Sequence, residues 1–330
     1  MAVGFEGLFD LVPDGVELEA MEDLVRDDVV PRHGVVELVG TGHFSKDDPV
    51  IRRTDLPRVR SILVALAARA AGASQVDGET QYAAELLHLA LGVHDLALGQ
   101  KGGRRRRAAR RLFRRSVGWL AGNHLTLRAL ELSRARDSQV FDALVDTLRE
   151  FAGAQALSRG LLGGRIPTRQ DWLEHAGSCT GALFSFCCRA GGQLAKGDPA
   201  TLSGLGRYGH HLGRLWHVAE DVSVLRHGDA GRHLVARALA GRPVLAVVCA
   251  SEVDPSIGEA WSVLVRAPKV GAAELLASRV VLTGGLAAAA EVMIQESWMA
   301  RRALRRLPPN RYRDALDHLA AGLAKAGLNK

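Results

Sequence analysis

The spacing of apolar residues along the chain predicts helices from residue 57 onward. In the first, apolar side chains recur at helical intervals from Ile62 to Ala70, Asp55 and Pro57 suit its start, and Gly72 ends it. The same period predicts further helices at 78–98, 107–135, 138–160, 168–195, 202–225, 232–240, 244–251, 256–265, 272–282, 286–307 and 310–326. Because no stretch alternates apolar and polar residues long enough to form a sheet, we expect an all-α fold built as a large bundle of roughly ten or more helices.

The beginning of the chain has a different pattern. Residues 1–55 mix Pro, Gly, Asp and Val without a sustained period, so we expect an irregular N-terminal arm followed by a single helical domain over residues 56–330. The start is acidic and lacks the basic region of a signal peptide, and no run of about 18 uncharged apolar residues occurs. The four cysteines form no CxxC pair. These features predict a cytoplasmic protein with reduced thiols.

Composition and charge change this picture at one place. Of the 330 residues, 47% are hydrophobic and only 5% aromatic, which agrees with helices rich in Ala and Leu. The formal net charge is +7, but the segment Lys101–Arg115 alone carries nine basic residues and no acidic one. The rest of the chain is slightly acidic, which excludes a uniformly basic surface of the kind that coats nucleic acid. Any polyanion must therefore bind locally.

Several short motifs follow one another in the order of a known family. Residues 83–95 (AAELLHLALGVHD) resemble the signature "AxELxHxxSLxHDDxxD" of trans-polyprenyl diphosphate synthases. Residues 58–63 (RVRSIL) resemble that family's "GKRxRPxL", and residues 208–225 (YGHHLGRLWHVAEDVSVL) resemble its "GxxLGxAFQxxDDxxD". Residues 180–184 (TGALF), 241–243 (GRP) and the tail from residue 300 are similar to the family's "KTxxLF", "GKxTLP" and closing helices. The resemblance covers roughly residues 57–323.

This resemblance implies an isoprenoid-synthase fold, in which helices surround a central cavity. In the family, two Asp-rich clusters face each other across the top of the bundle and share Mg²⁺ ions. These ions hold the diphosphate of an allylic substrate, which is then elongated with isopentenyl diphosphate. The growing prenyl chain lies in an apolar tunnel between the helices.

The acidic clusters are incomplete in this chain. The residues at their positions that could still bind metal are Asp95, Glu220 and Asp221. Their other positions hold residues without a carboxylate, namely Leu96, Gly99 and Val224. One carboxylate on the first wall cannot bridge a pair of metals, since each Mg²⁺ requires near-octahedral oxygen coordination.

The diphosphate-binding positions are preserved only in part, since the family's Gln is His217 here, its late Lys is Arg242, and its first Gly-Lys is Leu56-Pro57. The residues that the resemblance places there are Arg58, Arg60, Arg104, Arg105, Thr180, His217 and Arg242. The family's Lys before Thr is replaced by Cys179, and losing one electrostatic donor of this kind costs on the order of 10²–10³ in rate. Our leading hypothesis is therefore a catalytically degenerate member, acting as a non-catalytic or regulatory subunit or as a prenyl-diphosphate-binding protein. No cofactor is expected, and Mg²⁺ would be needed only for residual activity. The alternative is an active prenyltransferase that elongates an allylic diphosphate through a non-standard site.

The resemblance also implies a partner subunit. The family dimerises through the helices after the first cluster, here about residues 117–151, which suggests a homodimer or a heterodimer with an Asp-rich prenyl synthase subunit. The apolar residues that could form this interface are Val117, Leu120, Leu125, Leu127, Leu130, Leu132, Val140, Leu144 and Leu148. Each of them could equally belong to the core of the same bundle.

The basic segment 101–115 lies where the family has a diphosphate-binding loop. Its arginines could bind a diphosphate without metals, because the planar guanidinium matches phosphate oxygens. They could instead contact a membrane surface or nucleic acid, or form a solvated turn without a ligand. The sequence leaves these three interpretations open.

Overall fold

The computed structural model describes residues 59–76, 78–99, 105–161, 165–227 and 229–328. The proposed N-terminal arm lies outside the described residues. The helices are α5 Val59–Ala70, α6 Gly78–Gly99, α7 Arg105–Arg136, α8 Ser138–Leu161, α9 Arg169–Ala176, α10 Ala182–Leu194, α11 Pro199–His227, α12 Ala230–Ala240, α13 Leu245–Val253, α14 Pro255–Arg266, α15 Val270–Leu282, α16 Gly285–Ala303 and α17 Arg311–Leu328. These ranges contain no strand, and the all-α prediction is confirmed.

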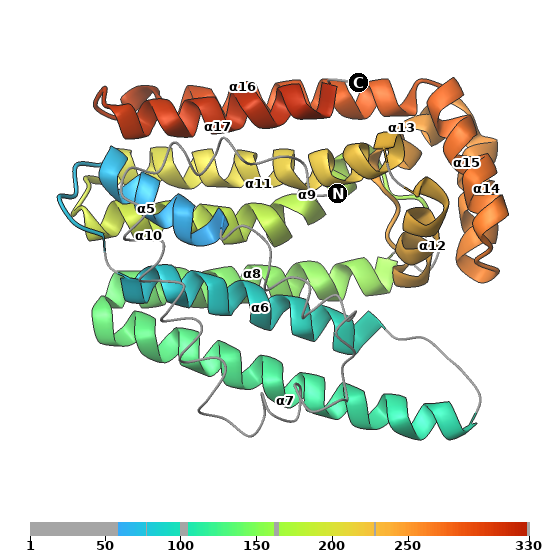
Figure 1. Ribbon diagram of the computed structural model, residues 1–330, viewed down its shortest axis with the longest axis horizontal. Helices are drawn as coiled ribbons and strands as arrows, with labels where there is room; N and C mark the ends of the chain where they lie inside the picture. The colour runs from blue at the N-terminus through green and yellow to red at the C-terminus, as the bar shows by residue number, and fades with distance from the viewer. Residues whose placement is uncertain (1–58, 77, 100–104, 162–164, 228, 329–330) are drawn as a thin grey trace.

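The helices are stacked in layers (Figure 1). Helices α16 and α17 form one outer layer, α5, α10 and α11 lie beneath it, and α6 and α8 separate these from α7 on the opposite side. The short helices α12 to α15 gather at one end of the bundle, next to the end of α11. This arrangement places the acidic end of α11 beside α12.

The segment predicted as one helix over residues 168–195 is divided in the structure. Its start is fixed by a capping box, in which the Thr168 hydroxyl accepts a hydrogen bond from the Asp171 backbone N–H at 3.1 Å. After α9, the π-helical turn Gly177–Gly181 (η3) leads into α10. A Cβ at Gly213 of α11 would lie only 2.5 Å from the Thr180 carbonyl oxygen, so glycine is needed where α11 crosses this turn. The close crossing brings Thr180 next to α11.

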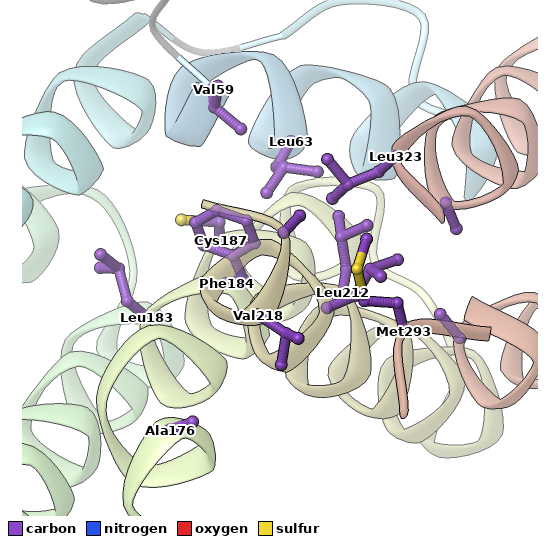
Figure 2. Close-up of a cluster of buried hydrophobic side chains, with 14 of the residues drawn as sticks. Val59, Leu63, Ala176, Leu183, Phe184, Cys187, Leu212, Val218, Met293 and Leu323 are labelled. Atoms are coloured by element: carbon purple, nitrogen blue, oxygen red, sulfur yellow. The ribbon is translucent and has the colours of Figure 1, made fainter. Parts of the chain in front are cut away.

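The core is centred on α10 and α11. Figure 2 shows side chains of α5, α10, α11, α16 and α17 meeting in one cluster, with Phe184 and Cys187 near Leu63 and Leu212. All four are fully buried, and burying a large apolar side chain stabilises the fold by about 1.5–3 kcal/mol. Burial raises the pKa of the Cys187 thiol well above its usual value, and all four cysteines are free thiols.

The apolar residues proposed for dimerisation differ in exposure. The side chain of Val117 lies outside the described part of the structure, and three of the others are partly buried against the core, namely Leu125, Leu130 and Leu148. Leu132, Val140 and Leu144 are buried in the core of this chain. Leu120 and Leu127 on α7 are 65% and 59% exposed. The core interpretation therefore holds for Leu132, Val140 and Leu144, whereas Leu120 and Leu127 are the most exposed of the described residues on this face.

No single helix in the described ranges is both long and apolar enough to cross a membrane. Two bent helix pairs, α12 with α13 and α15 with α16 and the following turn, reach that length and composition only when each pair is taken together.

Candidate functional site

The end of α11 carries two consecutive carboxylates with different surroundings. Asp221 is 2% exposed and accepts hydrogen bonds at Oδ1 from the Arg237 guanidinium and from His233 Nε2, the latter at 3.2 Å. Glu220 is exposed and accepts a hydrogen bond from Trp216 Nε1 at 2.9 Å. The structure therefore does not bring Glu220 and Asp221 together as a pair of metal ligands.

The charge of Asp221 is balanced inside the protein. Burial alone raises the pKa of this carboxyl, but the attraction of Arg237 and the hydrogen bond from His233 outweigh it and lower the pKa to about 2. Asp221 is consequently ionised at neutral pH and forms an ion pair with the partly exposed Arg237. Its second oxygen, Oδ2, has no hydrogen-bond partner among the described residues.

His217 lies one helical turn before Asp221, at the crossing with the π-helical turn. Its Nδ1 is 3.3 Å from the Thr180 hydroxyl, and its ring centroid is 5.3 Å from that of Trp172. Trp172 is fixed by a hydrogen bond from its Nε1 to the Pro243 carbonyl at 2.8 Å. Burial, reinforced by Arg237, lowers the pKa of His217 to about 4. At neutral pH this imidazole therefore provides hydrogen bonding but no positive charge.

Arg242 follows the C-terminal end of α12. Gly241 ends this helix in the left-handed conformation at φ 70°, which directs the chain into residues 242–243. The Arg242 guanidinium donates a hydrogen bond to Gln155 Oε1 on α8. Arg242 thus links α8 to the segment after α12, and its side chain is only partly exposed.

Arg60 lies on the inner side of α5. It is 8% exposed, and its guanidinium carbon is 5.8 Å from the centroid of the Phe184 ring. Beside it, Glu85 of α6 accepts hydrogen bonds from the Ser61 N–H at 3.0 Å and from the Ser61 hydroxyl at 3.1 Å. Glu85 therefore satisfies an N-terminal backbone donor of α5, a role that the motif alone does not indicate.

The remaining candidates are only partly described. Asp95 lies in α6 and Arg105 begins α7, but their side chains are outside the described part of the structure. Arg58 and Arg104 lie outside the described residues altogether. The first acidic cluster and the basic segment 101–115 therefore remain predictions.

Sequence reasoning did not identify the partners of Asp221. His233 and Arg237 are four residues apart on α12, a spacing that places both on one helical face. That pattern was readable in the sequence, but nothing in it indicated which carboxylate the pair would contact. Nothing in the sequence indicated Gln155 as the partner of Arg242.

The described residues do not fit a family-type Mg²⁺ cluster. Mg²⁺ requires near-octahedral oxygen ligands at about 2.0–2.1 Å. In the described ranges no three His, Cys, Asp or Glu side chains converge closely enough to hold a metal ion. Moreover, Asp221 Oδ1 already interacts with two donors, and Glu220 is directed to Trp216.

Comparison with known structures shows a shared fold. The chain superposes on a polyprenyl synthase from Caulobacter crescentus, crystallised with calcium and isoprenyl diphosphate, with a TM-score of 0.78, 22% identity and coverage of 93% of this chain and 94% of that one. A geranylgeranyl pyrophosphate synthetase from Pyrococcus horikoshii gives a TM-score of 0.77 at 20% identity, with coverage of 97% and 99%. The isoprenoid-synthase architecture expected from the sequence is thereby confirmed.

Sequence comparison shows to which protein family the chain belongs. A segment of 77 residues is 35% identical to the geranylgeranyl diphosphate synthase of Mycobacterium tuberculosis, but it spans only 23% of this chain and 20% of that synthase. The sequence model of the family described as Polyprenyl synthetase matches residues 57–228, more than half of the chain. The chain therefore belongs to the polyprenyl synthetase family.

Proposed function

We propose that this protein is a catalytically degenerate polyprenyl synthase, which acts in isoprenoid biosynthesis as a non-catalytic or regulatory subunit or as a prenyl-diphosphate-binding protein. The observation that carries the proposal is the ion pair of the buried Asp221 with the partly exposed Arg237, supported by His233. A Mg²⁺ ion at this carboxylate would have to compete with the guanidinium. The metal would have to displace a cation that is already bound, so it would need several further ligands.

Polar groups that suit a diphosphate support the binding part of the proposal. Thr180 and neutral His217 form one hydrogen-bonding pair beside α11, and Arg242 adds a positive charge near α8. The polyprenyl synthase from Caulobacter crescentus that shares this fold was crystallised with isoprenyl diphosphate. We propose that a prenyl diphosphate binds this chain through arginine and hydroxyl donors, which are charge-assisted partners for phosphate oxygens.

An exposed apolar surface on α7 supports the subunit part of the proposal. Leu120 and Leu127 are exposed, and the ring centroid of Trp119, which is 43% exposed, lies 5.1 Å from that of His94 on α6. Aromatic and aliphatic side chains of this kind are enriched in the centres of protein interfaces. We propose that this surface contacts a second copy of the chain or an Asp-rich prenyl synthase subunit.

One observation favours the enzyme alternative. Asp221 Oδ2 is buried without a hydrogen-bond partner among the described residues, so a ligand would satisfy it. An active prenyltransferase with a non-standard site would use this oxygen. The third interpretation, a membrane or nucleic-acid contact through residues 101–115, has no described side chain to support it.

A turnover assay distinguishes a catalytically degenerate protein from an active prenyltransferase. The full-length protein is incubated with Mg²⁺, labelled isopentenyl diphosphate and, in turn, dimethylallyl, geranyl and farnesyl diphosphate. We expect extractable product at the level of a blank without protein. Chain elongation well above that blank overturns the degenerate assignment.

A binding assay then tests the ligand. We expect geranyl diphosphate to bind in calorimetry with the same Kd in Mg²⁺ and in EDTA. Arg242→Gln should weaken it about tenfold, because a hydrogen bond to a charged group contributes about 1.5–3 kcal/mol. Arg232→Gln is the matched control, since Arg232 is 80% exposed on α12 and pairs only with Asp229 among the described residues. Absence of binding in both buffers would leave the subunit role alone, which co-purification of an Asp-rich synthase from the native host tests.

A further inference from the structure

A surface groove outside the family site lies between the end of α16 and the start of α17. Its volume is about 380 Å³, and Trp298, Arg302 and Arg305 contribute to its lining. Leu304, which is 2% exposed, lines it as well. The two helices run together along one outer layer of the bundle (Figure 1).

The charges in the groove do not cancel. Arg301 Nε lies 2.9 Å from Asp317 Oδ1, and Arg313 Nη2 lies 3.0 Å from Asp314 Oδ1. Each acidic residue that lines the groove therefore has an arginine of its own. Arg302 and Arg305 have no carboxylate partner among the described residues, which leaves a surplus of two positive charges.

The groove also has an apolar side. Trp298 is 50% exposed, and the Arg302 guanidinium carbon lies 5.1 Å from the centroid of its ring. A cation–π contact of this kind holds the guanidinium over the ring, and its N–H groups remain available to an oxyanion. One turn earlier on the same face of α16, Ile294 is also 50% exposed. An apolar strip thus leads along α16 to the two uncompensated arginines.

The position of these arginines near the C-terminus of α16 explains only part of their clustering. Cations near a helix C-terminus are stabilised by about 0.3–1 kcal/mol, which accounts for basic residues in the last turn of α16. The same effect applies to Arg266, which is exposed in the last turn of α14 without a carboxylate partner among the described residues. Arg266 does not line the groove, and it therefore serves as the matched control for a helix-end arginine.

From this geometry we infer that the groove binds a phosphate ester with an apolar tail. The phosphate lies against Arg302 and Arg305, where planar guanidinium groups match its oxygens. The tail covers Trp298 and Ile294, which removes their exposed surface from water. The same chemistry is offered by a free amphipathic phosphate and by the headgroup of a membrane phospholipid.

The test uses the full-length protein and offers it the same phosphate ester in two forms, as a monomeric lipid and in a membrane. Monomeric dihexanoylphosphatidic acid and vesicles of phosphatidylcholine with and without phosphatidic acid are titrated while tryptophan emission is followed. We expect a saturable change that is lost in Trp298→Phe. Arg302→Gln and Arg305→Gln should each weaken binding about tenfold, whereas Arg266→Gln should not change it. Thermal unfolding of each variant checks that the fold is retained.

The outcomes separate the two sources and can reject the site. Binding of the monomeric lipid without vesicle binding indicates a free phosphate ester, and binding only to vesicles that contain phosphatidic acid indicates a membrane headgroup. Both results support the groove. Three results overturn it: no binding of either probe, binding that Arg302→Gln leaves unchanged, or equal weakening by Arg266→Gln.

Discussion

Replacing Arg237 by glutamine tests whether the protein itself provides the cation that neutralises the buried carboxylate of α11. In this variant Asp221, which is 2% exposed, keeps only His233 as a partner among the described residues. The pKa of Asp221 lies at about 2, compared with its ordinary value of 3.8. A difference of that size corresponds to about 2 kcal/mol of stability at neutral pH. Removing one member of a fully buried pair costs about 3–5 kcal/mol, and the partial exposure of Arg237 together with the remaining hydrogen bond from His233 places our expectation at about 2–3 kcal/mol.

The pH dependence of the loss has a definite sign. Because the folded pKa of Asp221 is lowered, its stabilising contribution is present above the ordinary pKa and is lost as the pH falls toward about 2. Without Arg237, burial dominates and the pKa of Asp221 rises. The carboxyl of the variant then becomes neutral at mild acidity and no longer needs a cation. The difference in stability between wild type and Arg237→Gln should therefore be large at neutral pH and shrink as the pH falls.

The stability difference between wild type and Arg237→Gln is measured by urea unfolding at several pH values, with circular dichroism as the signal. Arg232→Gln on the same helix should change stability by less than about 1 kcal/mol, since its pair with Asp229 is exposed. The double variant Asp221→Asn with Arg237→Gln should be more stable than Arg237→Gln alone, because no buried charge remains unpaired. If Arg237→Gln costs no more than Arg232→Gln, the ion pair does not neutralise this wall of the site, and the main support for the proposed function is lost.

Two further substitutions test the packing that positions the site. Gly209→Ala should cost about 3 kcal/mol in urea unfolding, because a Cβ there would lie 2.3 Å from the Phe184 carbonyl oxygen and the backbones of α10 and α11 would have to separate. Gly153→Ala, where nothing lies within 4 Å of the added Cβ, should be neutral or slightly stabilising, and equal effects of the two would contradict the close crossing. Tyr208→Phe should cost about 1 kcal/mol in the same assay, since it removes a buried 2.7 Å hydrogen bond from the Tyr208 hydroxyl to the Leu316 carbonyl. An unchanged midpoint would show that this bond contributes nothing to stability.

The candidate site could be predicted only in part from the sequence. Motif spacing placed Thr180 and His217 on neighbouring helices, and the structure brings them to 3.3 Å. The same spacing suggested Glu220 and Asp221 as a pair, but their side chains have different partners. Adjacent residues on a helix point in directions about 100° apart, so sequence proximity alone could not make them one site.

The sequence by itself determined the helices and their order. Helix formation depends on local features, namely the apolar period, capping residues such as Thr168 and Asp171, and breakers such as Gly241, and all of these are visible along the chain. The net charge and its concentration in residues 101–115 are equally local. These features were sufficient for the fold class and for most helix boundaries.

Only the tertiary structure decided what surrounds the functional side chains. The contact of Arg237 with Asp221, that of Gln155 with Arg242 and the groove beside Trp298 depend on how α8, α11, α12, α16 and α17 pack. Burial then sets the chemistry at His217, where it lowers the pKa to about 4 and leaves the imidazole neutral, whereas at Asp221 the attraction of Arg237 outweighs burial and keeps the carboxylate ionised. Desolvation and ion pairing are properties of three-dimensional neighbours, and for that physical reason the sequence could name the candidate residues but not their charge states or their partners.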